Sequence, residues 1–181
     1  MSRIERALAL VGLLATAGCP GSECGTEGAP ASGIVAATAP TTLEYGELVA
    51  GLNNDCPADD APAGVISLTI AGRQTGAVGF FTLCVERPDR LADELALGVD
   101  VKGSAVHIID VTGGADNCTY RFDEATPPTG TATGDGVCGN GGDPAGFALV
   151  VDGTISLDRT CGGVVDKVTV TLSGRVAATP P

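Results

Sequence analysis

The sequence predicts an all-β protein: a single antiparallel β-sandwich, or a partly open barrel, with disulfides and at most one short helix. Three observations support this class. Apolar and polar residues alternate in several short stretches, β-branched residues are frequent there, and turns rich in Gly and Asp separate the stretches. Alternation with a period of two is the pattern of a strand that buries one face. Many short strands joined by such turns are typical of sandwiches and barrels.

The clearest strand lies near the end of the chain. Its apolar face holds Val168, Val170, Leu172 and Val176, and the odd-numbered positions from 167 to 175 are polar. The same signal predicts strands at residues 65–71, 77–86, 99–101, 105–111, 118–122, 147–151 and 155–157. Only residues 89–97 have a helical spacing, with Leu91 and Leu95 four apart after Pro88. That segment is short, and a loop is the alternative.

The first residues resemble a bacterial signal peptide. Arg3 and Arg6 form a short cationic region, and the apolar run at residues 7–15 has the length of a signal-peptide core. The run is too short to cross a bilayer, which takes about 20 apolar residues. The stretch Thr16-Ala17-Gly18-Cys19 resembles the lipobox of bacterial lipoproteins, with Thr16 where that family prefers Leu. The resemblance implies that a dedicated peptidase removes residues 1–18 and that the Cys19 thiol receives a diacylglyceryl group.

Three segments follow from this interpretation. Residues 1–18 are the signal peptide, residues 19–42 are a lipidated flexible tether rich in Pro, Gly, Ala, Ser and Thr, and residues 43–181 are the β-sandwich domain. Two alternatives stay open at the N-terminus: ordinary secretion with cleavage after Ala15 or Ala17, and a buried N-terminal helix. We expect an exported protein, anchored by lipid to the bacterial cell envelope. The outer membrane is the favoured location, with the leaflet open.

The seven cysteines support the same interpretation. If Cys19 carries lipid, an even set of six remains as disulfide candidates: Cys24, Cys56, Cys84, Cys118, Cys138 and Cys161. Disulfides form and persist in the oxidising compartments that exported proteins enter. Six cysteines allow 15 connectivities, and the sequence does not choose among them. Zinc is disfavoured, because the closest cysteine pair includes the predicted lipid site and the chain has one histidine.

The net charge of −12 argues against nucleic acid as a partner. Removal of residues 1–18, which carry two arginines and one glutamate, changes this charge to −13. A polyanion of this size repels phosphate backbones. The predicted partner is the membrane, reached through the lipid anchor, and the sequence does not identify a protein or small-molecule partner.

Enzymatic chemistry has little support. Nucleophilic catalysis needs a base beside a Ser, Thr or Cys, and the only histidine, His107, lies in a predicted strand where it shares a face with Ala105 and Ile109. A glycosidase needs two carboxylates at a defined separation, and carboxylates are too abundant here to single out a pair. The chain also has no Trp for sugar stacking. We predict no catalytic residues, with a periplasmic or surface hydrolase as the alternative.

One Gly-rich segment, residues 133–144, is a candidate calcium loop. Asp135, Asn140 and Asp143 offer the oxygen ligands that calcium prefers, and the glycines would let backbone carbonyls turn inward. The spacing differs from that of an EF-hand, and a disulfide-pinned surface loop is the simpler interpretation. The acidic turn at residues 53–60 is likewise interpreted as a solvated loop. No other cofactor is expected. The leading function is a non-enzymatic binding or scaffolding lipoprotein, with a calcium-binding module as a further alternative.

Overall fold

The computed structural model of the chain describes residues 33–38, 41–90, 93–98, 106–140 and 143–178. The predicted signal peptide, Cys19, Cys24 and the strand predicted at 99–101 lie outside these residues. Ten strands form one sheet. Their bounds are β1 Gly33–Thr38, β2 Thr41–Leu52, β3 Leu68–Gln74, β4 Phe80–Val85, β5 Glu94–Gly98, β6 Val106–Ala115, β7 Cys118–Phe122, β8 Thr129–Asn140, β9 Asp143–Cys161 and β10 Val164–Ala178. The all-β class predicted from the sequence is confirmed.

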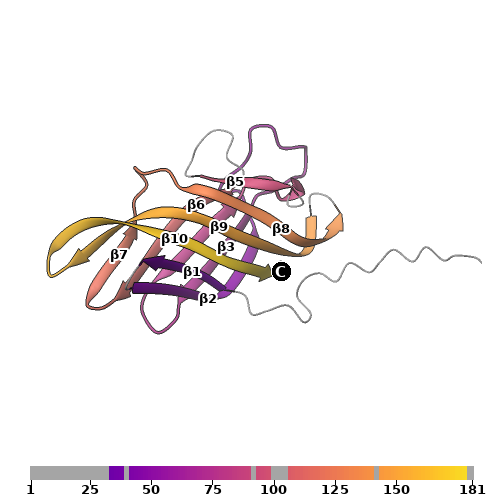
Figure 1. The fold of residues 1–181 in the computed structure, drawn as a ribbon. Coiled ribbons are helices and arrows are strands. Elements are labelled where there is room, and N and C mark those ends of the chain that lie inside the picture. Colours follow the sequence, from indigo (N-terminus) through magenta and orange to yellow (C-terminus); the bar gives the residue numbers. More distant parts are fainter. Residues whose placement is uncertain (1–32, 39–40, 91–92, 99–105, 141–142, 179–181) are drawn as a thin grey trace, which may run out of the picture.

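The strand pairings close the sheet on itself. An antiparallel ring runs β1–β2–β3–β4–β6–β7–β9–β10 and returns from β10 to β1. At one end β7 lies between β6 and β9, and at the other end β5 and β8 take that place, with β5 parallel to β6. In Figure 1, β8, β9 and β10 cross over β3 and β6, so the closed sheet is flattened into two layers. The ring corresponds to the barrel alternative, fully rather than partly closed.

Alternation places the core between the two layers. In β10 the buried residues are Val170, Leu172 and Val176, as the sequence predicts, with Val168 packed at the margin. In β3, Leu68 and Ile70 are buried, whereas Ile66 is 40% exposed because the strand starts two residues after it. The largest buried side chain, Tyr45 of β2, packs against Phe81 and donates a hydrogen bond to the carbonyl of Thr112 at 3.0 Å. A buried hydroxyl therefore has a partner, as burial in an apolar core requires.

The predicted tether, residues 19–42, extends too far. Residues 33–38 form β1, which pairs with β10 on one side and with β2 on the other, and β2 begins at Thr41. Ile34 and Ala36 are buried in the core. The small alanines of this segment suggest a linker by composition, but Ile34 and Ala36 are buried and alternate with less buried residues, as in a strand with one face on the core.

The segment with helical spacing contains a turn and a strand. A three-residue 3-10 helix covers Pro88–Arg90, and β5 begins at Glu94. Leu95 and Leu97, two apart, are both buried, so a period of two determines the structure. Within the described residues, no helix is long and apolar enough to cross a membrane.

Two disulfides join the strands. Cys118 and Cys161 lie directly opposite each other on β7 and β9, with their Cα atoms 4.4 Å apart. Cys56, in the loop after β2, is bonded to Cys84 of β4 at a Cα separation of 6.1 Å. Four of the six predicted disulfide cysteines are thus paired. Cys24, like the side chain of Cys138, lies outside the described part of the chain.

Candidate functional site

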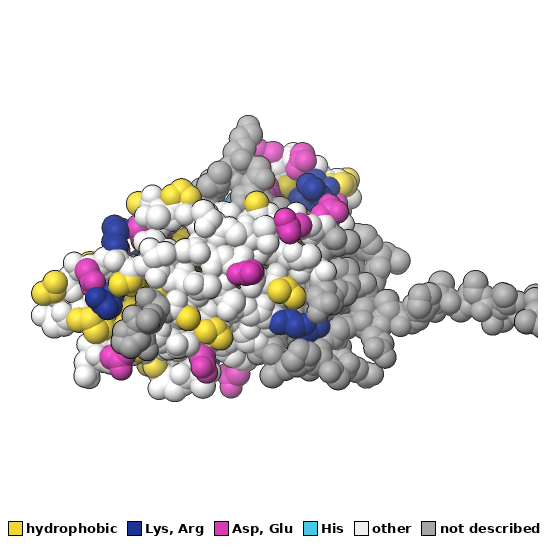
Figure 2. Space-filling model, viewed as in Figure 1, with side chains coloured by type: hydrophobic (Ala, Val, Ile, Leu, Met, Phe, Trp, Pro, Cys, Tyr) yellow, Lys and Arg dark blue, Asp and Glu magenta, His cyan; other side chains and the backbone are white. Residues whose placement is uncertain are grey.

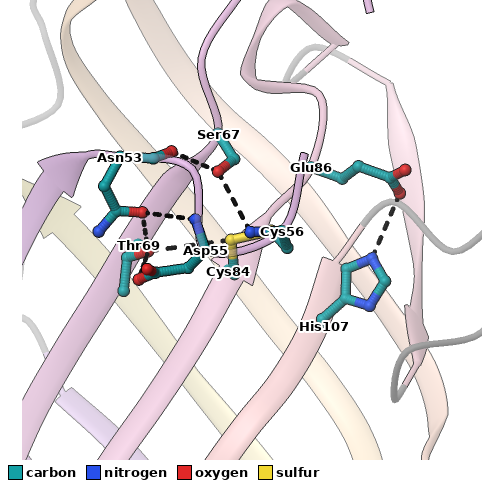
Figure 3. The surroundings of a disulfide bond; sticks show 8 residues. All are labelled: Asn53, Asp55, Cys56, Ser67, Thr69, Cys84, Glu86 and His107. Carbon is teal, nitrogen blue, oxygen red and sulfur yellow. Dashed lines mark hydrogen bonds and ion pairs between the residues drawn. A yellow bond between two sulfur atoms is a disulfide. The ribbon is translucent and has the colours of Figure 1, made fainter. Parts of the chain in front are cut away.

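The most densely connected polar region surrounds the Cys56–Cys84 disulfide (Figure 3). Thr69, Cys84 and His107 occupy matching positions on the neighbouring strands β3, β4 and β6. All three point away from the core, because their flanking residues on each strand face inward. Cys84 is nevertheless fully buried, because the disulfide holds the loop that carries Cys56 over it.

Hydrogen bonds fasten this loop to β3. The Ser67 hydroxyl donates to the backbone carbonyl of Asn53 at 2.5 Å and accepts from the backbone N–H of Cys56 at 3.4 Å. The Thr69 hydroxyl lies 2.7 Å from both Asn53 Oδ1 and Asp55 Oδ2, and its one proton serves either acceptor. Each hydroxyl beside the disulfide is therefore engaged in holding the loop rather than presented to a substrate.

His107 contacts a carboxylate on the same surface. Its Nε2 lies 3.3 Å from Glu86 Oε2, and the two side chains are 13% and 19% exposed. This geometry could orient a general base, but nucleophilic catalysis needs a hydroxyl or thiol within reach as well. The nearest candidates drawn in Figure 3 are the bonded Cys84 and the engaged Thr69. Among the residues drawn there, the contact between Glu86 and His107 joins the end of β4 to β6, and the hydroxyl and sulfur beside it are already engaged.

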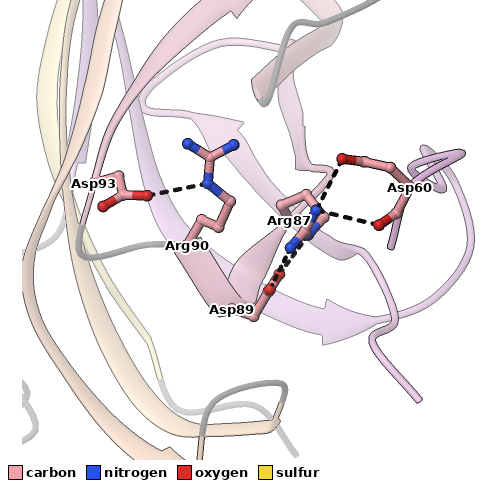
Figure 4. A network of polar contacts seen from close by, with 5 residues as sticks. All are labelled: Asp60, Arg87, Asp89, Arg90 and Asp93. Carbon is pink, nitrogen blue, oxygen red and sulfur yellow. Dashed lines mark hydrogen bonds and ion pairs between the residues drawn. The ribbon is translucent and has the colours of Figure 1, made fainter. Parts of the chain in front are cut away.

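A second polar network continues this region (Figure 4). Arg87 donates two hydrogen bonds to Asp89, from Nε at 2.8 Å and from NH2 at 2.7 Å, and its NH1 lies 3.3 Å from Asp60 Oδ2. The bonds from Arg87 lower the pKa of Asp89 and raise the pKa of Arg87 itself. Beside it, Arg90 donates to Asp93 at 3.0 Å. Bidentate geometry makes the Arg87–Asp89 pair the most rigid of these contacts. The contact between Arg87 and Asp60 joins the turn after β4 to the loop that carries Asp60.

A third cluster lies on the outer face of β7, β9 and β10. The Lys167 ammonium of β10 is 2.6 Å from Asp123 Oδ2 and 3.1 Å from Asp158 Oδ1. Asp123, only 5% exposed, also accepts hydrogen bonds from the Thr126 hydroxyl and the Ala125 N–H. The bond from Lys167, followed by that from Thr126, lowers the pKa of Asp123 to about 2. The carboxylate therefore stays ionised and serves as a fixed anchor for three strands.

The candidate calcium ligands fall on an extended hairpin. Asp135 and Asn140 lie in β8, Asp143 begins β9, and Asn140 is the register partner of Asp143. Much of the segment expected to be a loop is thus strand, and the side chains of these three residues are outside those described. Among the described side chains, no group of three or more His, Cys, Asp or Glu could hold a metal ion. Calcium binding through Asp135, Asn140 and Asp143 stays a prediction.

The sequence did not single out the Glu86–His107 pair or the Lys167 cluster. Glu86 and His107 are 21 residues apart, and Asp123 and Lys167 are 44 apart, so only strand pairing brings each of these pairs together. Asp158 is nine residues from Lys167, across the β9–β10 hairpin. A comparison of the chain with protein-family models, with curated proteins and with solved structures found no match. Any function must therefore be argued from the residues themselves.

Proposed function

We propose that this chain is a lipid-anchored protein of a bacterial cell envelope, whose β domain binds or scaffolds other molecules without catalysing a reaction. The observation that carries the proposal is the pair of disulfides built into the domain, Cys56–Cys84 and Cys118–Cys161. Such bonds persist in oxidising compartments and are rare in the cytosol. Export is the step that the disulfides and the N-terminal segment support independently.

The lipid anchor rests on the resemblance at residues 16–19. Ala17 and Gly18 supply the small residues that precede a lipidated cysteine in bacterial lipoproteins. Buried acyl chains contribute roughly 0.8 kcal/mol per CH₂ to membrane binding, and more than one chain makes an anchor durable. With a net charge of −13 after removal of residues 1–18, the protein would be repelled by anionic lipid. The lipid would therefore supply the attachment alone.

The non-enzymatic part of the proposal rests on the engaged polar groups. His107 is paired with Glu86, and the hydroxyls of Ser67 and Thr69 are bonded within the loop. The closed sheet and its two disulfides form a rigid body, which suits presentation of a surface. A hydrolytic activity on ester or glycoside substrates that falls more than about a hundredfold in His107→Gln would contradict this part.

Labelling with palmitate in the producing bacterium tests the anchor. The wild-type chain should incorporate label, and intact-mass analysis should find an acylated N-terminus at Cys19. The variant Cys19→Ala should lose the label, whereas Cys24→Ala, which removes a neighbouring cysteine, should keep it. An unlabelled wild-type protein cleaved after Ala15 or Ala17 would support ordinary secretion and overturn the anchor, while leaving export intact.

A further inference from the structure

The first half of β10 has one open edge. On one side, β10 pairs with β9 along its whole length, from Val164 to Ala178. On the other side, β1 pairs only with Thr171–Arg175. No strand in the described part of the chain pairs with the outer side of residues 164–169, which we call the free β10 edge. In Figure 1 the β9–β10 hairpin projects from the body of the sheet at the left.

The hairpin turn determines which backbone groups face outward. Cys161 and Val164 are register partners across the two-residue turn Gly162-Gly163, whose φ values of 57° and 86° are those of a type I′ turn. In such a hairpin the even-numbered residues of β10 bond to β9, and the odd-numbered residues point their N–H and C=O groups away. Val165, Lys167 and Thr169 therefore present backbone donors and acceptors along about 14 Å of edge.

The charged side chains of this segment do not guard the edge. A lysine on an edge strand commonly blocks pairing with another strand. Here the Lys167 ammonium lies over β9 and β7, held by Asp158 and Asp123. Asp166 is likewise drawn to its register partner Arg159 of β9, at 2.5 Å and 3.0 Å. Both charged side chains lie on the β9 side of β10, so they leave the free β10 edge accessible.

The hairpin is also apolar and locally neutral in a strongly acidic chain. Val164 and Val165 are 69% and 62% exposed. Residues 157–169 of the hairpin carry Asp158, Arg159, Asp166 and Lys167, whose charges cancel. Figure 2 shows hydrophobic, basic and acidic side chains gathered at this left-hand end. Two copies of a −12 chain repel one another in general, but the hairpin itself adds no net charge to that repulsion.

We propose that the free β10 edge pairs with the same edge of a second copy of this chain. In an antiparallel arrangement about a two-fold axis at Lys167, Val165 of each copy lies opposite Thr169 of the other copy. Such pairing would form about six backbone hydrogen bonds. The two Lys167 ammonium groups then lie near each other, and each is compensated by Asp123 and Asp158 of its own copy. The contact is shorter than a standard interface, so the dimer is weak and concentration-dependent.

Sedimentation of the full chain carrying Cys19→Ala tests the dimer without a lipid group. The mass should rise from one chain toward two as concentration increases, and added salt should strengthen the dimer because it screens the repulsion between acidic copies. Val165→Pro removes an outward N–H from each copy and leaves the β9 hydrogen bonds intact. It should weaken the dimer about thirtyfold, as expected for two lost hydrogen bonds. The matched control Val165→Ala, which keeps the N–H, should stay within about threefold of wild type.

Hydrogen exchange on the wild-type protein gives a second result that needs no variant. The amides of Val165, Lys167 and Thr169 should become protected as concentration rises, while those of Asp166 and Val168 should be protected throughout. A single-chain mass up to about 1 mM with unprotected edge amides would overturn the proposal. A dimer that Val165→Pro leaves unchanged would also overturn it, because the contact would lie elsewhere. Either result is independent of lipidation at Cys19.

Discussion

Asp123 illustrates how much of this protein is decided by single polar residues. It follows β7 and is almost fully buried, yet it carries a charge that Lys167, Thr126 and Ala125 compensate. Its backbone N–H also donates to the carbonyl of Ser156 at 3.0 Å. A buried carboxylate is tolerated only when its oxygens are bonded in this way. One residue thus links the end of β7 to β9 and to β10.

The depressed pKa of Asp123 predicts a loss of stability in acid. Its pKa is about 2 in the folded chain against an ordinary 3.8. The ionised form therefore favours the folded state above about pH 4, and this contribution disappears as the pH falls toward 2. Asp123→Asn should be less stable than wild type at pH 7, and the difference should shrink below pH 4. Urea unfolding at pH 7, 4 and 2.5 measures it.

A control variant separates this effect from general charge. Asp152, on β9, is exposed, and Asp152→Asn should keep the pH dependence of the wild-type chain. If Asp123→Asn and wild type differed by the same free energy at all three pH values, the carboxylate would not be the group that titrates.

Close packing around Gly79 shows what residue patterns do not reveal. A Cβ on Gly79 would lie 2.5 Å from the Thr112 carbonyl and 2.5 Å from Gln74 Oε1. Gln74 itself is buried and exchanges two hydrogen bonds of 2.9 Å with the backbone of Gly114. The glycine leaves the room that this pair needs. Nothing in the local sequence around residue 79 indicates a partner more than 30 residues away.

At the level of strands, the local sequence pattern predicts a strand correctly where one face is buried and the other is exposed to solvent. The strand predicted at 118–122 matches β7 residue for residue, and the alternation at 167–176 lies within β10. It fails where the pattern is weak. Half of the residues of β1 are Ala or Gly, and its only strong signals are Ile34 and Val35. Its place between β10 and β2 depends on strands more than 130 residues away at one edge, which a local window does not contain.

A bulge interrupts the alternation of β6 two residues after His107. The register between β4 and β6 shifts so that Leu83 pairs with Ile108 and Thr82 with Asp110. Ile109 is therefore an extra residue in β6 and is 39% exposed. The sequence correctly places His107 in a strand. Its partner Glu86 becomes a neighbour only because β4 and β6 are adjacent in the sheet.

The two disulfides hold different parts of the sheet and should differ in their effect on stability. The Cys118–Cys161 bond joins neighbouring strands that are already paired, whereas Cys56–Cys84 fixes a loop and fills a buried position. Closing loops of these sizes stabilises a protein by roughly 4 kcal/mol in the chain-entropy model. Replacing Cys118 and Cys161 together by Ala should cost about 2–4 kcal/mol.

Replacing Cys56 and Cys84 by Ala should cost more, because the buried sulfur of Cys84 is lost as well. The difference between the two double variants, measured as free energies of unfolding in urea, is the informative quantity. Hydrogen exchange should also become faster in the loop at residues 53–67, and only in the variant that lacks Cys56 and Cys84. Equal losses and equal exchange would show that the loop is held by its hydrogen bonds and not by the disulfide.

For the whole molecule, ring closure accounts for both the success and the limits of sequence analysis. The all-β fold class and the strand positions can be predicted from alternation. Closure of the sheet depends on pairings such as β1 with β10, which join the two ends of the described chain. Closure also removes most sheet edges, so few strands are left that could pair with another chain. The free β10 edge persists because β10 extends beyond the end of β1. Its opposite edge is covered by β9 for all fifteen register pairs.

A count of free thiols tests the lipid anchor and the disulfides of the domain in one measurement. If Cys19 carries lipid and all six other cysteines pair, the oxidised protein has no free thiol. The two described disulfides then leave Cys24 and Cys138 as the remaining pair. Thiol titration in denaturant should find none in the wild-type protein and one in either Cys24→Ala or Cys138→Ala. Cys19→Ala should still show none, because its thiol is not needed for pairing. Two or more free thiols in the wild-type protein would refute the three-disulfide prediction. One free thiol that disappears in Cys19→Ala would place the fault in the lipid assignment instead.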